Sequence, residues 1–192
     1  MALRKERQFF DFSQYVPDRD YKMEYVEQEL QRDFESVEKW LYLGADSLDR
    51  TFVKVGMTVG DLRSRSYSSS RPSYFLFCAF KCKDKLSRAD IKIIEKDVLS
   101  RIDWLHRNPD GSSKRMRHFE SGAISECFSS VDFLEFYRDV HDAIYDHHRN
   151  NFVISGWVNE FGVEDGEFVD CIFNENTMND YKAYMRKIIR YD

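Results

Sequence analysis

The stretch that decides the fold runs from Trp40 to Arg65 and reads WLYLGADSLDRTFVKVGMTVGDLRSR. Two strand-like runs, WLYL and TFVKVG, stand on either side of the turn-rich segment ADSLDR. Apolar residues alternate with polar or aromatic ones in both runs, which predicts a β-hairpin with one buried face. Gly56 ends the second run, and a glycine there is typical of close backbone approach or of a bend. Thr58 or Asp61 can cap a helix after the hairpin.

The segments that follow the hairpin predict an α+β fold with a small mixed sheet of three strands. Residues 74–80, YFLFCAF, form an apolar and aromatic run that is too short for a typical helix, so we expect a central third strand there. Residues 88–105 carry an apolar stripe at three-to-four spacing, which predicts a helix opened by Ser87. A shorter helix is expected near 61–68. Helices would then flank the sheet.

Additions to this core are expected at both ends of the chain. Residues 1–39 contain an apolar pattern at helical spacing between 20 and 39, which predicts an N-terminal helical extension. The core would occupy residues 40–148, with RNPDGSSKRMRH as a basic loop and VDFLEFYRDVHDAIYDHH as a closing amphipathic helix. Residues 149–192 predict an α/β C-terminal extension, with strands around FVISGWV and EFVDCIF and a last helix DYKAYMRKIIR.

Composition narrows the class of protein. The chain of 192 residues holds 16 Phe and 11 Tyr, so we expect a well-formed core and little disorder. No run of about 18 apolar residues is present, which argues against a membrane partner. The N-terminus lacks the apolar segment of a signal peptide. Four cysteines include Cys78 and Cys82, which would share a strand face, but no second pair completes a zinc set. Free thiols and a cytoplasmic location follow.

The net charge of −5 hides an uneven distribution. Residues 51–118 carry a net charge of +8, whereas residues 1–50 carry −4 and residues 119–192 carry −9. A basic middle within an acidic chain suits a polyanionic partner such as DNA. The alternative is that the segments neutralise one another within the fold.

The hairpin motif resembles that of the GIY-YIG nuclease superfamily, in particular the branch associated with phages and large viruses. In that family the two signature triplets lie on the first and second strands, and here they read WLY at residues 40–42 and KVG at residues 54–56. VKVGMT, residues 53–58, is similar to the V-K-I-G-x-T of the branch. DLRSR, residues 61–65, matches the D-[LF]-x-x-R that follows it. The resemblance implies a GIY-YIG-like core.

The resemblance also implies a DNA endonuclease that hydrolyses phosphodiester bonds with one Mg²⁺ or Mn²⁺ ion, in the host cytoplasm if the chain is viral. Such chemistry needs a base to activate water, an arginine to neutralise phosphate and a carboxylate to hold the metal. The positions that match the family's catalytic residues are Tyr42, Lys54, Arg65 and Glu95, with Glu95 as the metal ligand. Lys54 replaces the second tyrosine of the family and could orient phosphate or lower the pKa of Tyr42.

Each of these residues also has an ordinary structural interpretation. Tyr42 could pack in the core or across the strands, and Lys54 and Glu95 could be solvated. Arg65 could be a surface charge on a helix. Leu99 stands where the branch often has a histidine, and no asparagine matches the one that completes the site in relatives.

Other residues are candidates for supporting roles. SECF, residues 125–128, resembles the E-[WC]-F that closes the domain in this branch, so Glu126 would line the site or make a structural hydrogen bond. His141, His147 and His148 favour a polar helix face over a metal site. Candidates for contact with DNA are Arg63, Arg71, Lys114, Arg115 and Arg117.

Two further functions stay open. The first is a catalytically weak nucleic-acid-binding module on the same fold, which Leu99 and the missing asparagine favour. The second is an acidic protein-interaction module, in which the acidic C-terminal region contacts a protein partner or a second copy of the chain. Both retain the predicted fold and differ from the nuclease in chemistry.

Overall fold

The predicted hairpin lies at the centre of the sheet. Strand β1 (Lys39–Asp46) pairs antiparallel with β2 (Val53–Val59), and Tyr42 is directly opposite Gly56. The carboxylate of Asp46 closes the loop between them by accepting the backbone N–H groups of Leu48 at 2.9 Å and Asp49 at 3.2 Å. The hairpin predicted from alternation is confirmed.

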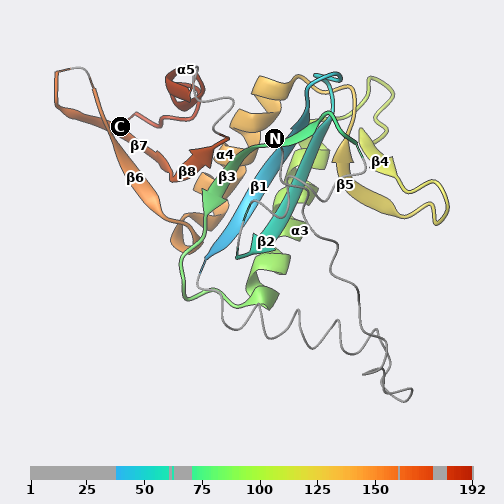
Figure 1. Cartoon of the computed structure of the whole chain (residues 1–192), viewed down its shortest axis with the longest axis horizontal. Coiled ribbons are helices and arrows are strands. Elements are labelled where there is room, and N and C mark those ends of the chain that lie inside the picture. Colours follow the sequence, from blue (N-terminus) through green and yellow to red (C-terminus); the bar gives the residue numbers. More distant parts are fainter. Residues whose placement is uncertain (1–37, 61, 63–70, 160, 175–180, 192) are drawn as a thin grey trace, which may run out of the picture. The chain divides into compact units, whose positions relative to one another are not determined.

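The computed structural model describes residues 38–60, 62, 71–159, 161–174 and 181–191 (Figure 1). All of them belong to one compact unit, Ser36–Asp192. The N-terminal helix expected over 20–39 lies outside the described residues, apart from its last two positions, where β1 begins at Lys39. The helix expected near 61–68 also lies outside them, apart from Leu62.

The sheet is larger than the sequence indicated. The third strand is confirmed as β3 (Tyr74–Lys81), which pairs with the free side of β1. The full order is β4-β5-β2-β1-β3-β8, where the added strands are β4 (Arg115–Arg117), β5 (Ile124–Phe128) and β8 (Cys171–Phe173). The α+β class is confirmed, but the prediction of three mixed strands is wrong. Over the described residues this sheet has six strands, and every neighbouring pair is antiparallel.

The missed strands are short and leave little periodic signal. β4 lies inside the segment that we interpreted as a basic loop, and β8 comes from the region expected to form a separate C-terminal extension. A three-residue strand shows no alternation from which a buried face can be predicted. Such a strand forms because a neighbouring strand provides its hydrogen-bonding partners.

Two helices share one apolar core with the sheet (Figure 1). Helix α3 (Arg88–Leu105) has the bounds that the sequence predicted, and α4 (Phe133–His148) follows β5. Ser87 caps α3 by accepting the N–H of Asp90 at 3.2 Å, and the Asp90 carboxylate accepts the N–H of Ser87 at 2.9 Å. This reciprocal cap satisfies two of the donors that a helix start leaves free.

A smaller apolar cluster lies apart from this core. It contains Trp40, Tyr42, Leu76 and Ala79, with Leu62 packed against it. Trp40 and Tyr42 alternate along β1 with Leu41 and Leu43 of the main core. Successive strand residues point to opposite faces, so Tyr42 lies on the face opposite α3 and α4.

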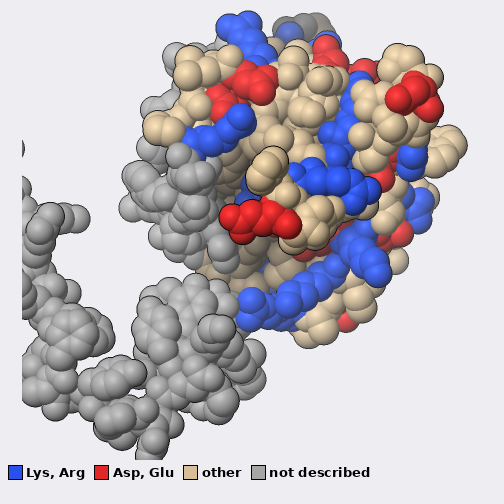
Figure 2. Space-filling model, turned by 90° about the vertical axis from the view of Figure 1, so that its right-hand side faces the viewer, with Lys and Arg blue, Asp and Glu red and all other residues tan. Residues whose placement is uncertain are grey.

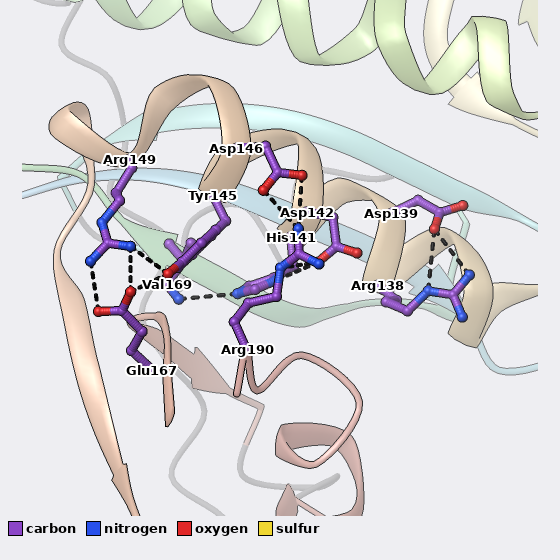
Figure 3. Close-up of polar contacts among 10 residues, drawn as sticks. All are labelled: Arg138, Asp139, His141, Asp142, Tyr145, Asp146, Arg149, Glu167, Val169 and Arg190. Carbon is purple, nitrogen blue, oxygen red and sulfur yellow. Dashed lines mark hydrogen bonds and ion pairs between the residues drawn. The ribbon is translucent and has the colours of Figure 1, made fainter. Parts of the chain in front are cut away.

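The C-terminal part of the chain contacts α4 through an ion pair (Figure 3). Strands β6 (Ile154–Val158) and β7 (Glu164–Val169) form a two-stranded sheet after the short helix η2 (Arg149–Asn151). Arg190 Nη2 forms an ion pair of 2.7 Å with Asp146 of α4, and Arg149 donates to Glu167 of β7. The predicted strand pair is present. The last helix, α5 (Tyr181–Met185), is much shorter than DYKAYMRKIIR suggested.

The four cysteines are free, as predicted. Cys78 and Cys82 both lie in the main core, and burial raises the pKa of the Cys82 thiol to about 12. Such a thiol is inert at neutral pH. None of the described helices is long and apolar enough to cross a membrane.

Candidate functional site

Tyr42 extends across β2 at the one position of the second triplet that has no side chain. A Cβ atom at Gly56 would lie 2.5 Å from both Cζ and Oη of the tyrosine. Non-bonded carbon atoms do not approach so closely, so any larger residue at position 56 would displace the ring. Only 4% of Tyr42 is exposed. The expectation of close approach at Gly56 is therefore confirmed, and the Tyr42 hydroxyl lies over the β2 backbone.

Glu95 reaches the same strand from α3. Its carboxylate accepts the backbone N–H of Met57. β5 pairs with β2 only at Val53 and Lys54, so Met57 lies beyond the end of that ladder. An unpaired strand edge needs acceptors, and the side chain of Glu95 supplies one.

The two contacts fall on consecutive residues of β2. The hydroxyl of Tyr42 lies over Gly56, and the carboxylate of Glu95 holds the next N–H along the chain. A phenol and a carboxylate therefore approach one short piece of strand, the first across a sheet face and the second at the open edge.

A cation and a second carboxylate act on Glu95. Burial and the charge of Glu126 raise the pKa of Glu95, while the Met57 N–H and the charge of Lys54 oppose the rise. The net direction is upward, because desolvation and like charge both favour the protonated form. Lys54, Glu95 and Glu126 come from β2, α3 and β5, and form what we call the β2-edge cluster. The sequence left the role of Glu126 open, and in the fold its charge acts on Glu95.

The two carboxylates of the β2-edge cluster suit a hard divalent cation. Mg²⁺ takes oxygen ligands, commonly one or two carboxylates together with water and phosphate oxygens. Within the described part of the chain, no group of three or more His, Cys, Asp or Glu residues is arranged to hold a metal. Glu95 would hold such an ion together with water and substrate oxygens, and the charge of Glu126 would add to the attraction.

Tyr74 is a neighbour that the sequence reasoning missed. A Cβ atom at Gly44 would overlap the Tyr74 ring and hydroxyl. Gly44 is the cross-strand partner of Lys54, so Tyr74 lies over the residue that is opposite Lys54. A glycine inside a strand run often marks such an approach, and Gly44 was the available signal.

Arg65 and Arg63 lie outside the described residues, so their relation to this cluster is not defined. Leu99 is 6% exposed and packs in the main core. Its position on α3 therefore contributes apolar burial.

The other basic candidates make contacts that hold loops in place. Arg71 forms an ion pair with Asp46 at 3.2 Å and lies over the ring of Phe52 at 4.6 Å. Arg115 and Arg117 of β4 each donate to a carbonyl of the neighbouring segment, at 2.8 Å. Lys114 precedes β4. Arg117 is exposed, which leaves most of its guanidinium open to a ligand.

The histidines of α4 differ from the polar face that we expected. His141 is completely buried: Nδ1 lies 3.0 Å from Asp142, and Nε2 accepts the N–H of Val169 at 3.1 Å (Figure 3). His148 contacts Asp97 at 2.8 Å, and only His147 is fully exposed. Their partners are carboxylates and backbone, which is a structural use of imidazole.

No family model, curated protein or solved structure matches this chain.

Proposed function

We propose that this chain is a metal-dependent DNA endonuclease of the GIY-YIG type. The observation that carries the proposal is that Tyr42 and Glu95 approach consecutive residues of β2 from different sides, Tyr42 over the sheet face opposite α3 and Glu95 at the strand edge, with Lys54 on the same strand. These three residues come from the signature hairpin and from the helix after the third strand. A general base, a cation and a carboxylate are what phosphodiester hydrolysis requires.

Each residue then has a distinct role. Tyr42 accepts a proton from the attacking water as the phenolate, or orients that water through its hydroxyl. The Lys54 ammonium group attracts a phosphate oxygen and offsets its charge. Glu95 would hold Mg²⁺ or Mn²⁺, which would supply positive charge to stabilise the leaving oxygen. Arg65, by its place in the motif, would bind the scissile phosphate in a fork.

A second candidate is a nucleic-acid-binding module without cleavage. The low exposure of Tyr42 favours it, because a base that water reaches poorly is a poor catalyst. Lys54, which replaces a tyrosine, also suits phosphate binding more than proton transfer.

Nicking of supercoiled plasmid with Mg²⁺ or Mn²⁺ separates these functions. We expect cleavage that EDTA abolishes, and loss of about 10²–10³-fold in rate for Glu95→Ala, the usual effect of removing one electrostatic group. DNA binding by that variant should persist, because Glu95 contacts metal and not phosphate. Tyr42→Phe keeps the ring over Gly56 and removes only the hydroxyl.

Glu135→Ala is a matched control, since Glu135 is an exposed carboxylate in the first turn of α4. It should cleave at the wild-type rate. Metal-independent DNA binding with no cleavage of plasmid or single-stranded DNA would support the binding module. Undiminished cleavage by both Tyr42→Phe and Glu95→Ala would refute the proposed site.

A further inference from the structure

Strands β4 and β5 form a hairpin, and the hydrogen-bonded turn between them carries an exposed aromatic ring. The N–H of His118 donates to the Ala123 carbonyl at 2.9 Å, and the N–H of Gly122 donates to the His118 carbonyl at 2.8 Å. Arg117 closes the turn from the side through the Gly122 carbonyl. Phe119, on this turn, is fully exposed. Such a ring contributes no buried apolar area to the fold, and its whole surface is accessible to a binding partner.

The surroundings of the ring are basic. Lys114, Arg115 and Arg117 lead into the turn, and Arg107 forms an isolated bridge at the base of the same segment. Figure 2 shows the side of the molecule on which β4 and β5 lie in Figure 1, where Lys and Arg side chains gather across the middle and lower parts of the face. Glu120 is the one acidic residue of the turn.

We propose that the β4–β5 hairpin binds single-stranded or unpaired nucleic acid, with Phe119 stacked on a nucleobase. Aromatic rings stack on every base, and flanking cations follow the phosphates, which is the usual pairing of groups in sites for single strands. The proposal rests on the proposed function for the identity of the partner as DNA. β5 also carries Glu126 of the β2-edge cluster, so a strand held at the turn is connected to the candidate site through one β-strand.

The C-terminal hairpin offers a matched comparison. Phe161 is 82% exposed in the turn between β6 and β7, where Asn159 accepts the N–H groups of Phe161 and Val163. The ring is therefore equally displayed on an ordered turn. Its neighbours Glu164 and Asp165 are acidic, and repel phosphate. The two phenylalanines differ mainly in the charge around them.

The test is fluorescence anisotropy with a labelled 20-nucleotide single strand and the corresponding blunt duplex, at fixed salt and without divalent metal. Phe119→Ala should weaken binding of the single strand by about fivefold or more, the size of one stacking contact. Phe119→Tyr should restore it, and Phe161→Ala should leave it unchanged. Duplex affinity should fall less, because its bases are already stacked. Circular dichroism should show equal melting temperatures, since both rings are exposed.

Three outcomes would overturn the inference: no binding of the single strand by the wild type, equal affinity for Phe119→Ala and wild type, or an equal loss in Phe161→Ala. The last would indicate an apolar surface for a protein partner. Failure of the proposed function would look different. A protein that never cleaves DNA, but whose Phe119→Ala variant loses single-strand binding, would support the hairpin proposal and refute the nuclease. Cleavage that depends on Glu95 but not on Phe119 would support the nuclease and refute the hairpin proposal.

Discussion

The backbone N–H of Val169 donates a hydrogen bond of 3.1 Å to Nε2 of His141 (Figure 3). An acceptor at Nε2 leaves the ring proton on Nδ1, which lies 3.0 Å from the Asp142 carboxylate. The imidazole is therefore neutral, and it joins α4 to β7 without exposure to solvent. Asp146 and Arg190 are the other charged groups that act on it.

This arrangement predicts that stability falls in mild acid. Burial lowers the pKa of His141 below its usual value, although Asp142 opposes the shift. The unfolded chain then binds a proton near pH 6.5 that the folded chain refuses, so stability is full above that pH and declines below it. The decline contributed by one proton is at most about 1.4 kcal/mol per pH unit. Urea unfolding at pH 7.5, 6.5 and 5.5 measures it.

His141→Gln provides the comparison for this slope. Glutamine can accept from Val169 and donate to Asp142, but it does not titrate. We expect its free energy of unfolding to depend less on pH over the same range, whatever its absolute value. A slope identical to that of the wild type would assign the pH dependence to other groups.

Gly56→Ala should disrupt the contact with Tyr42. The added methyl group would meet the ring at 2.5 Å, and overpacking of this kind costs about 1–3 kcal/mol. Chemical denaturation measures the loss. In a double-mutant cycle, the same substitution should cost clearly less in a Tyr42→Ala background, because the ring is gone. Equal costs in the two backgrounds would mean that Tyr42 does not restrict position 56.

The charges around Glu95 predict opposite shifts in the pH dependence of cleavage. In the proposed site Glu95 must be ionised to hold a cation, so the acid limb of the rate profile should follow its pKa. Glu126→Gln removes the like charge and should move this limb to lower pH, whereas Lys54→Met removes an attractive charge and should move it to higher pH. The midpoint is the readout, since both rates can fall. Shifts in the same direction would contradict the cluster.

Arg117 should contribute to DNA affinity through its positive charge, besides closing the turn through the Gly122 carbonyl. Replacing Arg117 with Gln should weaken binding across sequences and reduce the slope of log K against log salt by about one, because one phosphate contact is lost. Lys187→Gln, at an exposed site in the acidic C-terminal region, is the control and should leave the slope unchanged. Arg115→Gln should also lower thermal stability, since Arg115 holds the Ser125 carbonyl and lies over Phe128. Equal slopes for all three variants would remove β4 from the DNA surface.

The sequence by itself determined the hairpin, the third strand and α3. The expected bounds of β3 and α3 agree with the structure to within one residue, whereas β1 extends into the expected turn as far as Asp46, and β2 continues past Gly56 to Val59. Alternation and helical spacing are local properties, since they record which side of each segment is buried. Gly56 was identified for a related reason, because a glycine within a strand run indicates an absent side chain where another group must pass. The catalytic expectation for Arg65 stays a prediction.

Only the tertiary structure decided which segments cover those buried sides. β8 joins β3 across about ninety residues of chain, Tyr74 lies over Gly44, and the charge of Glu126 on β5 acts on Glu95 of α3. Local periodicity carries no record of these partners, because pairing between distant segments depends on register and on the packing of the whole sheet. His141 shows the same limit. Its position on α4 indicated a polar face, and β7 buried it.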